Sequence, residues 1–84
     1  MYKVVLVEDE RILLEGLRLT TPWAAHGFQV VGCAENAAQA RSLILSLRPD
    51  LVITDIRLPE VSGLELIESL TERIMCDYVI ISGY

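Results

Sequence analysis

The sequence predicts an α/β domain built on an open sheet of parallel strands. Short apolar runs rich in Val and Ile alternate along the chain with stretches in which apolar residues recur at helical spacing. The apolar runs lack an alternation of apolar and polar residues, which is typical of parallel strands covered on both faces. Strands that alternate with helices are joined by right-handed crossovers. The order β-α-β-α-β-α-β therefore predicts a doubly wound parallel sheet in one domain that spans residues 1–84.

The predicted strands are the four apolar runs, at residues 3–7, 29–34, 51–54 and 78–82. Three helical patterns separate them, in residues 10–20, in residues 36–47 and after residue 62. Asn36 is followed three residues later by Gln39, and Ser62 is followed in the same way by Glu65. This spacing is the capping-box pattern, so Asn36 and Ser62 are the predicted N-caps of the second and third helices.

The composition excludes several classes of protein. The 84 residues carry a formal net charge of −5, and the seven Lys and Arg residues are scattered along the chain. Nucleic-acid-binding modules usually present a basic patch, so we expect no nucleic-acid binding by this chain itself. No apolar run is long enough for a secretory signal or a membrane span, and the expected location is the cytoplasm. Cys33 and Cys76 lie in apolar surroundings and are expected to be buried thiols.

Acidic residues follow the first and third predicted strands where each strand ends. Glu8, Asp9 and Glu10 follow the first strand, and Asp55 follows the third. If these strands are neighbours, Glu8, Asp9 and Asp55 meet at the edge where open parallel sheets bind their ligands. Crowded carboxylates repel one another, and Mg²⁺, which prefers oxygen ligands, would relieve that repulsion. For Glu10 we prefer another role, as an N-cap at the positive end of the helix dipole.

A carboxylate at this edge can also be the reacting group. Aspartyl phosphate is a known type of covalent intermediate, and its formation requires a cation that offsets the charge of the incoming phosphoryl group. A hydroxyl at the end of a neighbouring strand, here Ser82, is suited to bond a phosphate oxygen. Asp55 is therefore the candidate phosphoacceptor.

Three motifs resemble the receiver domain of two-component response regulators, namely VLVEDE at 5–10, VITDIRLPEVSGLEL at 52–66 and VIISGY at 79–84. Their order and spacing match as well, with Pro59 four residues and Gly63 eight residues after Asp55. The resemblance covers the whole chain. The segments TPWAAHGF and SGY are also similar to receivers attached to DNA-binding outputs of the arabinose-regulator type.

The resemblance implies a flavodoxin-like fold, in which a complete receiver has the strand order 2-1-3-4-5. It implies that Asp55 accepts a phosphoryl group from a sensor histidine kinase and switches an output, with transcription as the expected one. Mg²⁺ is the implied cofactor. Asp9 would be a direct ligand beside Asp55, Glu8 would act through the water shell of the metal, and the backbone carbonyl of Arg57 would be the other protein ligand. The family more often has two Asp residues where this chain has Glu8 and Asp9.

Three further residues take roles from the same resemblance. Ser82 would be the switch hydroxyl that turns toward the phosphate. Pro59 and Gly63 would shape the loop that follows the phosphorylation site.

The resemblance stops after the fourth strand. The expected sheet is therefore incomplete, with order 2-1-3-4 and without the fourth helix, fifth strand and fifth helix of the family. The phosphate-binding Lys of the family has no counterpart, because Lys3 is the only lysine and lies at the opposite end of the first strand. We expect a phosphoacceptor signalling domain rather than an enzyme, with impaired phosphotransfer. An exposed fourth strand and an uncovered sheet face also predict a homo-oligomer.

Other interpretations stay open. One is a non-catalytic truncated or engineered half-fold whose main behaviour is self-association. Another is a Mg²⁺-dependent phosphohydrolase with an Asp nucleophile, which is less consistent with the sequence because Ile56 and Arg57, rather than a second acid, follow Asp55. A dinucleotide-binding domain is disfavoured, because no Gly-x-Gly-x-x-Gly motif follows the first predicted strand.

Overall fold

The computed structural model describes residues 1–81. Its four strands form one parallel sheet of order β2-β1-β3-β4, which confirms the predicted fold class and strand order. The elements in chain order are β1 (Tyr2–Val7), α1 (Arg11–Thr20), the 3₁₀ turn η1 (Ala24–His26), β2 (Phe28–Ala34), α2 (Ala37–Leu47), β3 (Leu51–Asp55), α3 (Gly63–Leu70) and β4 (Asp77–Ile81).

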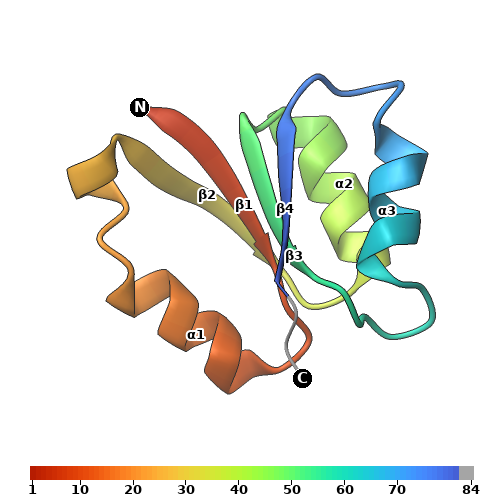
Figure 1. Cartoon of the computed structure of the whole chain (residues 1–84), viewed down its shortest axis with the longest axis horizontal. Helices are drawn as coiled ribbons and strands as arrows, with labels where there is room; N and C mark the ends of the chain where they lie inside the picture. The colour runs from red at the N-terminus through yellow and green to blue at the C-terminus, as the bar shows by residue number, and fades with distance from the viewer. Residues whose placement is uncertain (82–84) are drawn as a thin grey trace.

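The helices cover the two faces of the sheet unequally. Figure 1 shows α2 and α3 on one face and α1 alone on the other, beneath β1 and β2. β1 lies between two paired neighbours and is buried from Val4 to Val7. Val5 and Val7 pack with α2 and α3, whereas Val4 and Leu6 pack with Leu14 of α1. Burial on both faces explains why this strand is a continuous apolar run.

The observed strands differ from the predicted ones by one residue at several ends. β1 begins at Tyr2, whose N–H donates to the Gly27 carbonyl at 2.8 Å. β4 begins at Asp77, whose N–H donates to the Asp50 carbonyl at 3.0 Å. Asp is uncommon in strands, so the sequence pattern placed the start of this strand one residue later, at Tyr78. The predicted end of the fourth strand at residue 82 lies outside the described residues.

The predicted caps of α2 and α3 are confirmed. The Asn36 side chain accepts a hydrogen bond from the Gln39 N–H at 2.8 Å, and the Ser62 hydroxyl accepts one from the Glu65 N–H at 3.1 Å. Glu10 occupies the N-cap position of α1, but its side chain makes no capping hydrogen bond. The side-chain capping predicted for Glu10 is therefore wrong, and Glu10 retains only its place at the helix start.

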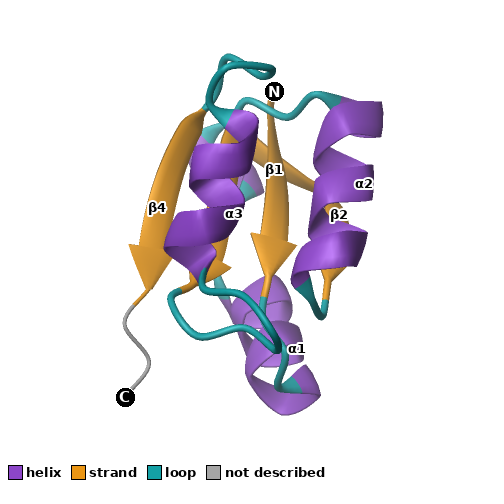
Figure 2. Ribbon diagram, turned by 90° about the vertical axis from the view of Figure 1, so that its right-hand side faces the viewer, coloured by secondary structure: helices purple, strands orange, loops and turns teal. Residues whose placement is uncertain are grey.

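Within residues 1–81, β4 has a paired neighbour on one side only. Figure 2 shows it at the free edge of the sheet, with α3 over one face. Val79 and Ile81 of β4 remain 45% and 39% exposed, because α1 covers the other half of the sheet. The prediction of an edge strand with an incompletely covered face is thus confirmed for the described part of the chain. None of the helices in that part is long and apolar enough to span a bilayer.

Candidate functional site

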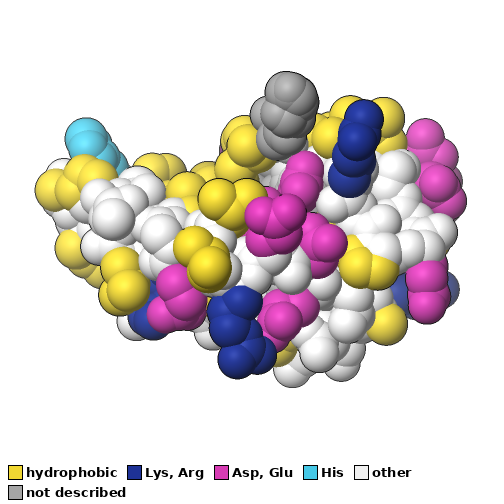
Figure 3. All heavy atoms as spheres, turned by 90° about the horizontal axis from the view of Figure 1, so that it is seen from below, with side chains coloured by type: hydrophobic (Ala, Val, Ile, Leu, Met, Phe, Trp, Pro, Cys, Tyr) yellow, Lys and Arg dark blue, Asp and Glu magenta, His cyan; other side chains and the backbone are white. Residues whose placement is uncertain are grey.

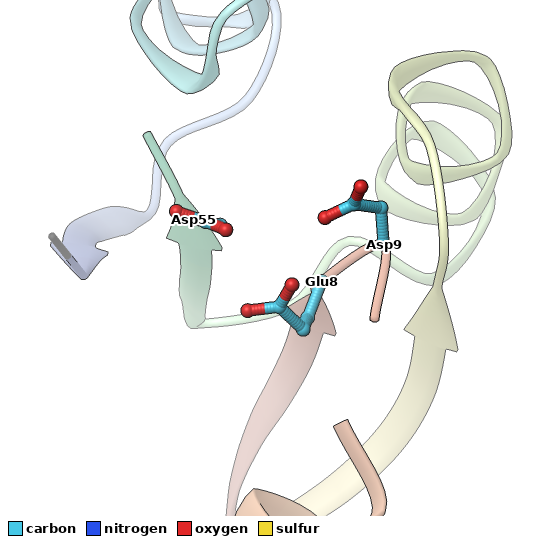
Figure 4. Close-up of side chains that lie close together, drawn as sticks. All are labelled: Glu8, Asp9 and Asp55. Atoms are coloured by element: carbon cyan, nitrogen blue, oxygen red, sulfur yellow. The ribbon is translucent and has the colours of Figure 1, made fainter. Parts of the chain in front are cut away.

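Three carboxylates converge at the carboxyl ends of β1 and β3. The two strands are paired neighbours, from Val4 opposite Leu51 to Val7 opposite Thr54. Glu8 and Asp9 follow β1, Asp55 ends β3, and one carboxylate oxygen of each lies within 4.8 Å of the others. Figure 4 shows the three side chains pointing toward a common space. The gathering predicted from the strand ends is therefore observed.

Glu8 has hydrogen-bond partners on both its backbone and its side chain. Its backbone N–H donates to the Ala34 carbonyl at 3.0 Å, and its carboxylate accepts from the Glu10 N–H at 3.1 Å. Partial burial raises the pKa of Glu8, the bond from Glu10 opposes that rise, and the nearby Asp55 and Asp9 carboxylates add to it. The two neighbouring carboxylates, which are the smaller cause of the raised pKa, supply the negative charge that a cation at this site would offset.

The Asp55 side chain is half-buried and makes few hydrogen bonds. Its Oδ1 accepts a hydrogen bond from the Arg57 N–H at 3.2 Å. Within residues 1–81, this is the one hydrogen bond that the Asp55 side chain makes. The backbone just after it is fixed more firmly, because the Ile56 N–H donates to the Ile81 carbonyl at 3.2 Å. One carboxylate oxygen of Asp55 is thus oriented by the chain, and the other accepts no hydrogen bond from residues 1–81.

The loop from β3 to α3 closes back onto Asp55 through Gly63. Gly63 is buried, and its N–H donates to the Ile56 carbonyl at 2.8 Å. A side chain at this position would collide with the Asp55 carbonyl oxygen, so the close approach of two backbones requires glycine. Pro59 is exposed, and its carbonyl accepts from the Val61 N–H at 2.8 Å.

Two loop features were not predicted from the sequence. Glu60 has a φ of 72°, which is unusual for a residue with a side chain. Arg57 forms an isolated antiparallel bridge with Ser62, which narrows the base of the loop. The sequence around the loop does not indicate either feature. Position 60, which takes the left-handed conformation, holds Glu rather than the Gly or Asn that usually adopts it.

Glu35 and Arg11 form an ion pair beside the carboxylate cluster. The Arg11 guanidinium lies 3.0 Å from the Glu35 carboxylate, across the carboxyl ends of β1 and β2. Asp9, Glu35 and Pro59 line a groove of about 610 Å³ beside the cluster. Figure 3, seen from the carboxyl ends of the strands, shows acidic side chains gathered on this side with basic ones near them. Glu35 was not predicted for this site, although its position directly after the second predicted strand is a signal of the same kind as the one that selected Asp55.

Two other predicted residues lie elsewhere. The Lys3 ammonium donates to the Leu47 carbonyl at 2.8 Å, at the amino end of β1, so it is remote from the carboxylates as predicted. The predicted switch residue Ser82 lies outside residues 1–81.

Comparisons with known proteins identify relatives over the whole chain. A family model described as "Response regulator receiver domain" matches residues 4–84. Transcriptional regulatory protein HptR of Staphylococcus aureus is 40% identical over 84 residues, which are 100% of this chain and 33% of HptR. The chain thus spans about a third of the length of the curated relatives it matches.

Solved structures show the same fold. The REC domain of AraT, a response regulator from Geobacillus stearothermophilus, matches with a TM-score of 0.92 at 33% identity, covering 99% of this chain and 65% of that one. The signal receiver domain of NarL from Mycobacterium tuberculosis matches with a TM-score of 0.84 at 26% identity, covering 99% and 67%. These likenesses confirm the flavodoxin-like arrangement predicted from the sequence.

Proposed function

The chain belongs to the response regulator receiver domain family, and we propose that it serves as a phosphoacceptor module with Asp55 as the phosphorylated residue. The observation that carries the proposal is the approach of the Glu8, Asp9 and Asp55 carboxylates to within 4.8 Å at the carboxyl ends of neighbouring strands. Open parallel sheets bind their ligands at this edge.

The chemistry of the donor atoms fits Mg²⁺. All three side chains offer hard oxygen ligands, and the three carboxylates within 4.8 Å of one another make a local excess of negative charge. Asp9 and Asp55 are the proposed direct ligands, with Glu8 acting through bound water and the Arg57 backbone carbonyl as a further ligand. When bound, the ion would supply positive charge that offsets the repulsion between Asp55 and an incoming phosphoryl group.

In the proposed reaction, a carboxylate oxygen of Asp55 attacks the phosphorus of a phosphohistidine. A P–O bond forms as the P–N bond breaks, and the imidazole nitrogen keeps the electron pair and takes up a proton. The Arg57 N–H holds Oδ1 at 3.2 Å, so the other oxygen is the better placed nucleophile. The proposed donor is a sensor histidine kinase, and Ser82 keeps its proposed role as the switch hydroxyl.

The loop residues support the acceptor rather than contact the phosphoryl group. Gly63 permits the close approach that closes the loop onto Asp55, and Pro59 begins the tight turn that precedes it. We propose regulation of transcription as the output, because HptR is named a transcriptional regulatory protein. An output of the arabinose-regulator type is proposed from the resemblance of the sequence at 21–28 and 82–84.

The proposal is tested by mass spectrometry of the chain after incubation with a phosphorylated kinase domain or with acetyl phosphate. We expect a Mg²⁺-dependent phosphoryl adduct on Asp55 that is absent from Asp55→Asn. Glu10→Gln is the matched control, because Glu10 is exposed and outside the cluster. An adduct that persists in Asp55→Asn, or that never forms with either donor, would overturn the proposal.

A further inference from the structure

Thr54 places a polar side chain in the interior of the sheet. It is fully buried, stands next to last in β3 and lies opposite Val7 of β1. Among the buried residues of the described range 1–81, it is the one with a polar side chain. A buried hydroxyl without a hydrogen bond costs free energy that a Val side chain of similar shape avoids. The hydrogen-bond partner of this hydroxyl is therefore what distinguishes Thr from Val at position 54.

The partner is the backbone carbonyl of Asp55. The Thr54 hydroxyl donates to this carbonyl at 3.0 Å. The pairing of β3 with β1 ends at Thr54 opposite Val7, so the register of these two strands does not extend to Asp55. The same carbonyl oxygen is the atom that a side chain at Gly63 would strike. A buried hydroxyl thus satisfies a backbone carbonyl at the point where the sheet ends and the loop begins.

The peptide unit between Asp55 and Ile56 is held at both of its polar groups. Its C=O accepts from the Thr54 hydroxyl, and its N–H, which belongs to Ile56, donates to the Ile81 carbonyl at 3.2 Å. Because a peptide unit is planar, these two bonds set the direction of the chain on either side of it. The Asp55 side chain branches at one end, and the other end leads to Arg57, whose N–H donates to Oδ1 of Asp55 at 3.2 Å. The orientation of one peptide therefore affects both the carboxylate and the loop residue that holds it.

We propose that Thr54 is a positioning residue for the phosphoacceptor, and that its hydroxyl sets the direction in which Asp55 presents its carboxylate. The inference rests on the proposed function of Asp55. The same hydrogen bond orients the start of the loop that carries the Arg57 carbonyl, the further ligand proposed for Mg²⁺. Thr54 itself lies in the core and does not touch the phosphoryl group. Misalignment of a reacting group reduces the rate, although the hydrogen bond that aligns it is of ordinary strength.

A purely structural role for Thr54 is the alternative, since Thr is common in strands. Loss of the hydroxyl would then change the stability of the fold and leave the site unaffected. Two matched pairs of proteins separate these roles. The wild type and Thr54→Val differ by a hydroxyl in place of a methyl group, and Thr54→Ser and Thr54→Ala differ by the hydroxyl alone. Because the second pair repeats the comparison on a smaller side chain, the test does not depend on one variant.

Hydrogen exchange of the Arg57 amide in the metal-free protein is the first readout. We expect it to be about threefold to tenfold faster in each protein that lacks the hydroxyl than in its matched partner. Val52→Ala is the control for stability, because Val52 is fully buried in the same strand and its truncation leaves the hydroxyl in place. Equal exchange within both pairs, or an equal acceleration in Val52→Ala, would overturn the proposal.

Mg²⁺ affinity, measured by calorimetry, and the rate of phosphorylation by acetyl phosphate complete the test. We expect both to fall by about threefold to tenfold in Thr54→Val and Thr54→Ala relative to their matched partners. Unchanged values in these two variants would overturn the positioning role and leave Asp55 as the phosphoacceptor. A wild type that forms no adduct would instead overturn the proposed function, and the Arg57 exchange and Mg²⁺ affinity would still decide the role of Thr54.

Discussion

The backbone of Gly63 lies directly against the carbonyl oxygen of Asp55, so close that no side chain fits between them. Gly63→Ala should therefore shift the loop or the end of β3 and lower the free energy of unfolding by about 1–3 kcal/mol. Urea denaturation measures the change. Gly16→Ala is the control, because a Cβ there meets nothing within 4 Å and Ala favours the helix. A Gly63→Ala protein as stable as the wild type would show that the loop tolerates a side chain at this position.

Arg48 ends α2 in the left-handed conformation, with a φ of 47°. Glycine adopts this conformation without strain, so Arg48→Gly should raise the free energy of unfolding by about 0.5–1 kcal/mol. Ser42→Gly, within α2 at an exposed position, should lower it instead. Thermal denaturation of both variants tests the opposite signs, and a loss of stability in Arg48→Gly would show that its side chain matters more than its backbone.

The Tyr78 hydroxyl is buried. It forms no hydrogen bond with any group of residues 1–81. Burial is the main reason that the pKa of Tyr78 lies far above its usual range, and the neighbouring Cys76 thiol adds to the rise. Tyr78→Phe removes an unsatisfied polar group and should stabilise the fold by about 1 kcal/mol. Tyr2→Phe is the control, since Tyr2 is 62% exposed and should change little. Destabilisation by Tyr78→Phe would reveal a hydrogen bond to this hydroxyl.

Burial raises the pKa of the Cys33 and Cys76 thiols above their ordinary value of 9.0. The thiolate is the reactive form, so both should react with iodoacetamide more slowly in the folded chain than in urea. The same shift makes stability fall as pH rises through 9.0, because only the unfolded chain then ionises its thiols readily. Equal alkylation rates in the two states would count against the prediction.

Removing one carboxylate from the cluster should have opposite effects without and with Mg²⁺. Asp9→Asn relieves repulsion at Glu8 and Asp55, so it should raise the melting temperature of the metal-free protein. Mg²⁺ at 100 times its Kd should stabilise the wild type by about 2.7 kcal/mol, and this gain should be lost in Asp9→Asn. Calorimetric scans with and without EDTA measure both effects. Glu10→Gln should retain the Mg²⁺ effect, and its loss there would place the ion elsewhere.

The strands and the acidic residues at their ends could be predicted because each depends on a pattern along the chain, whereas the strand order was implied by the resemblance to receiver domains. Continuous apolar runs mark strands buried on both faces, and strand ends place Glu8, Asp9 and Asp55 at one edge. The reason for Gly63 could not be predicted, because the contact that requires it joins two backbones in space. The positive φ values of Arg48 and Glu60 were also missed, since tertiary structure imposes them on residues without that preference.

Capping was predictable only where a side chain reaches its own helix. Asn36 and Ser62 bond as the pattern requires, but the Gln39 side chain accepts from the Glu35 N–H rather than from that of Asn36. Glu10 stands at a helix start and makes no side-chain cap, and its backbone N–H donates to the Glu8 carboxylate. The sequence pattern does not resolve which of these alternative hydrogen bonds forms.

The three carboxylates of the cluster differ in how firmly the backbone around them is held. Glu8 and Asp9 follow a strand that is buried on both faces and paired on both sides, so they stay together until the whole domain unfolds. Asp55 ends β3, which is likewise paired on both sides, but the backbone that follows it runs into a loop that is exposed at Arg57, Pro59 and Glu60. Opening of this loop would release the Arg57 N–H from Oδ1 of Asp55, whereas Glu8 and Asp9 would keep their places.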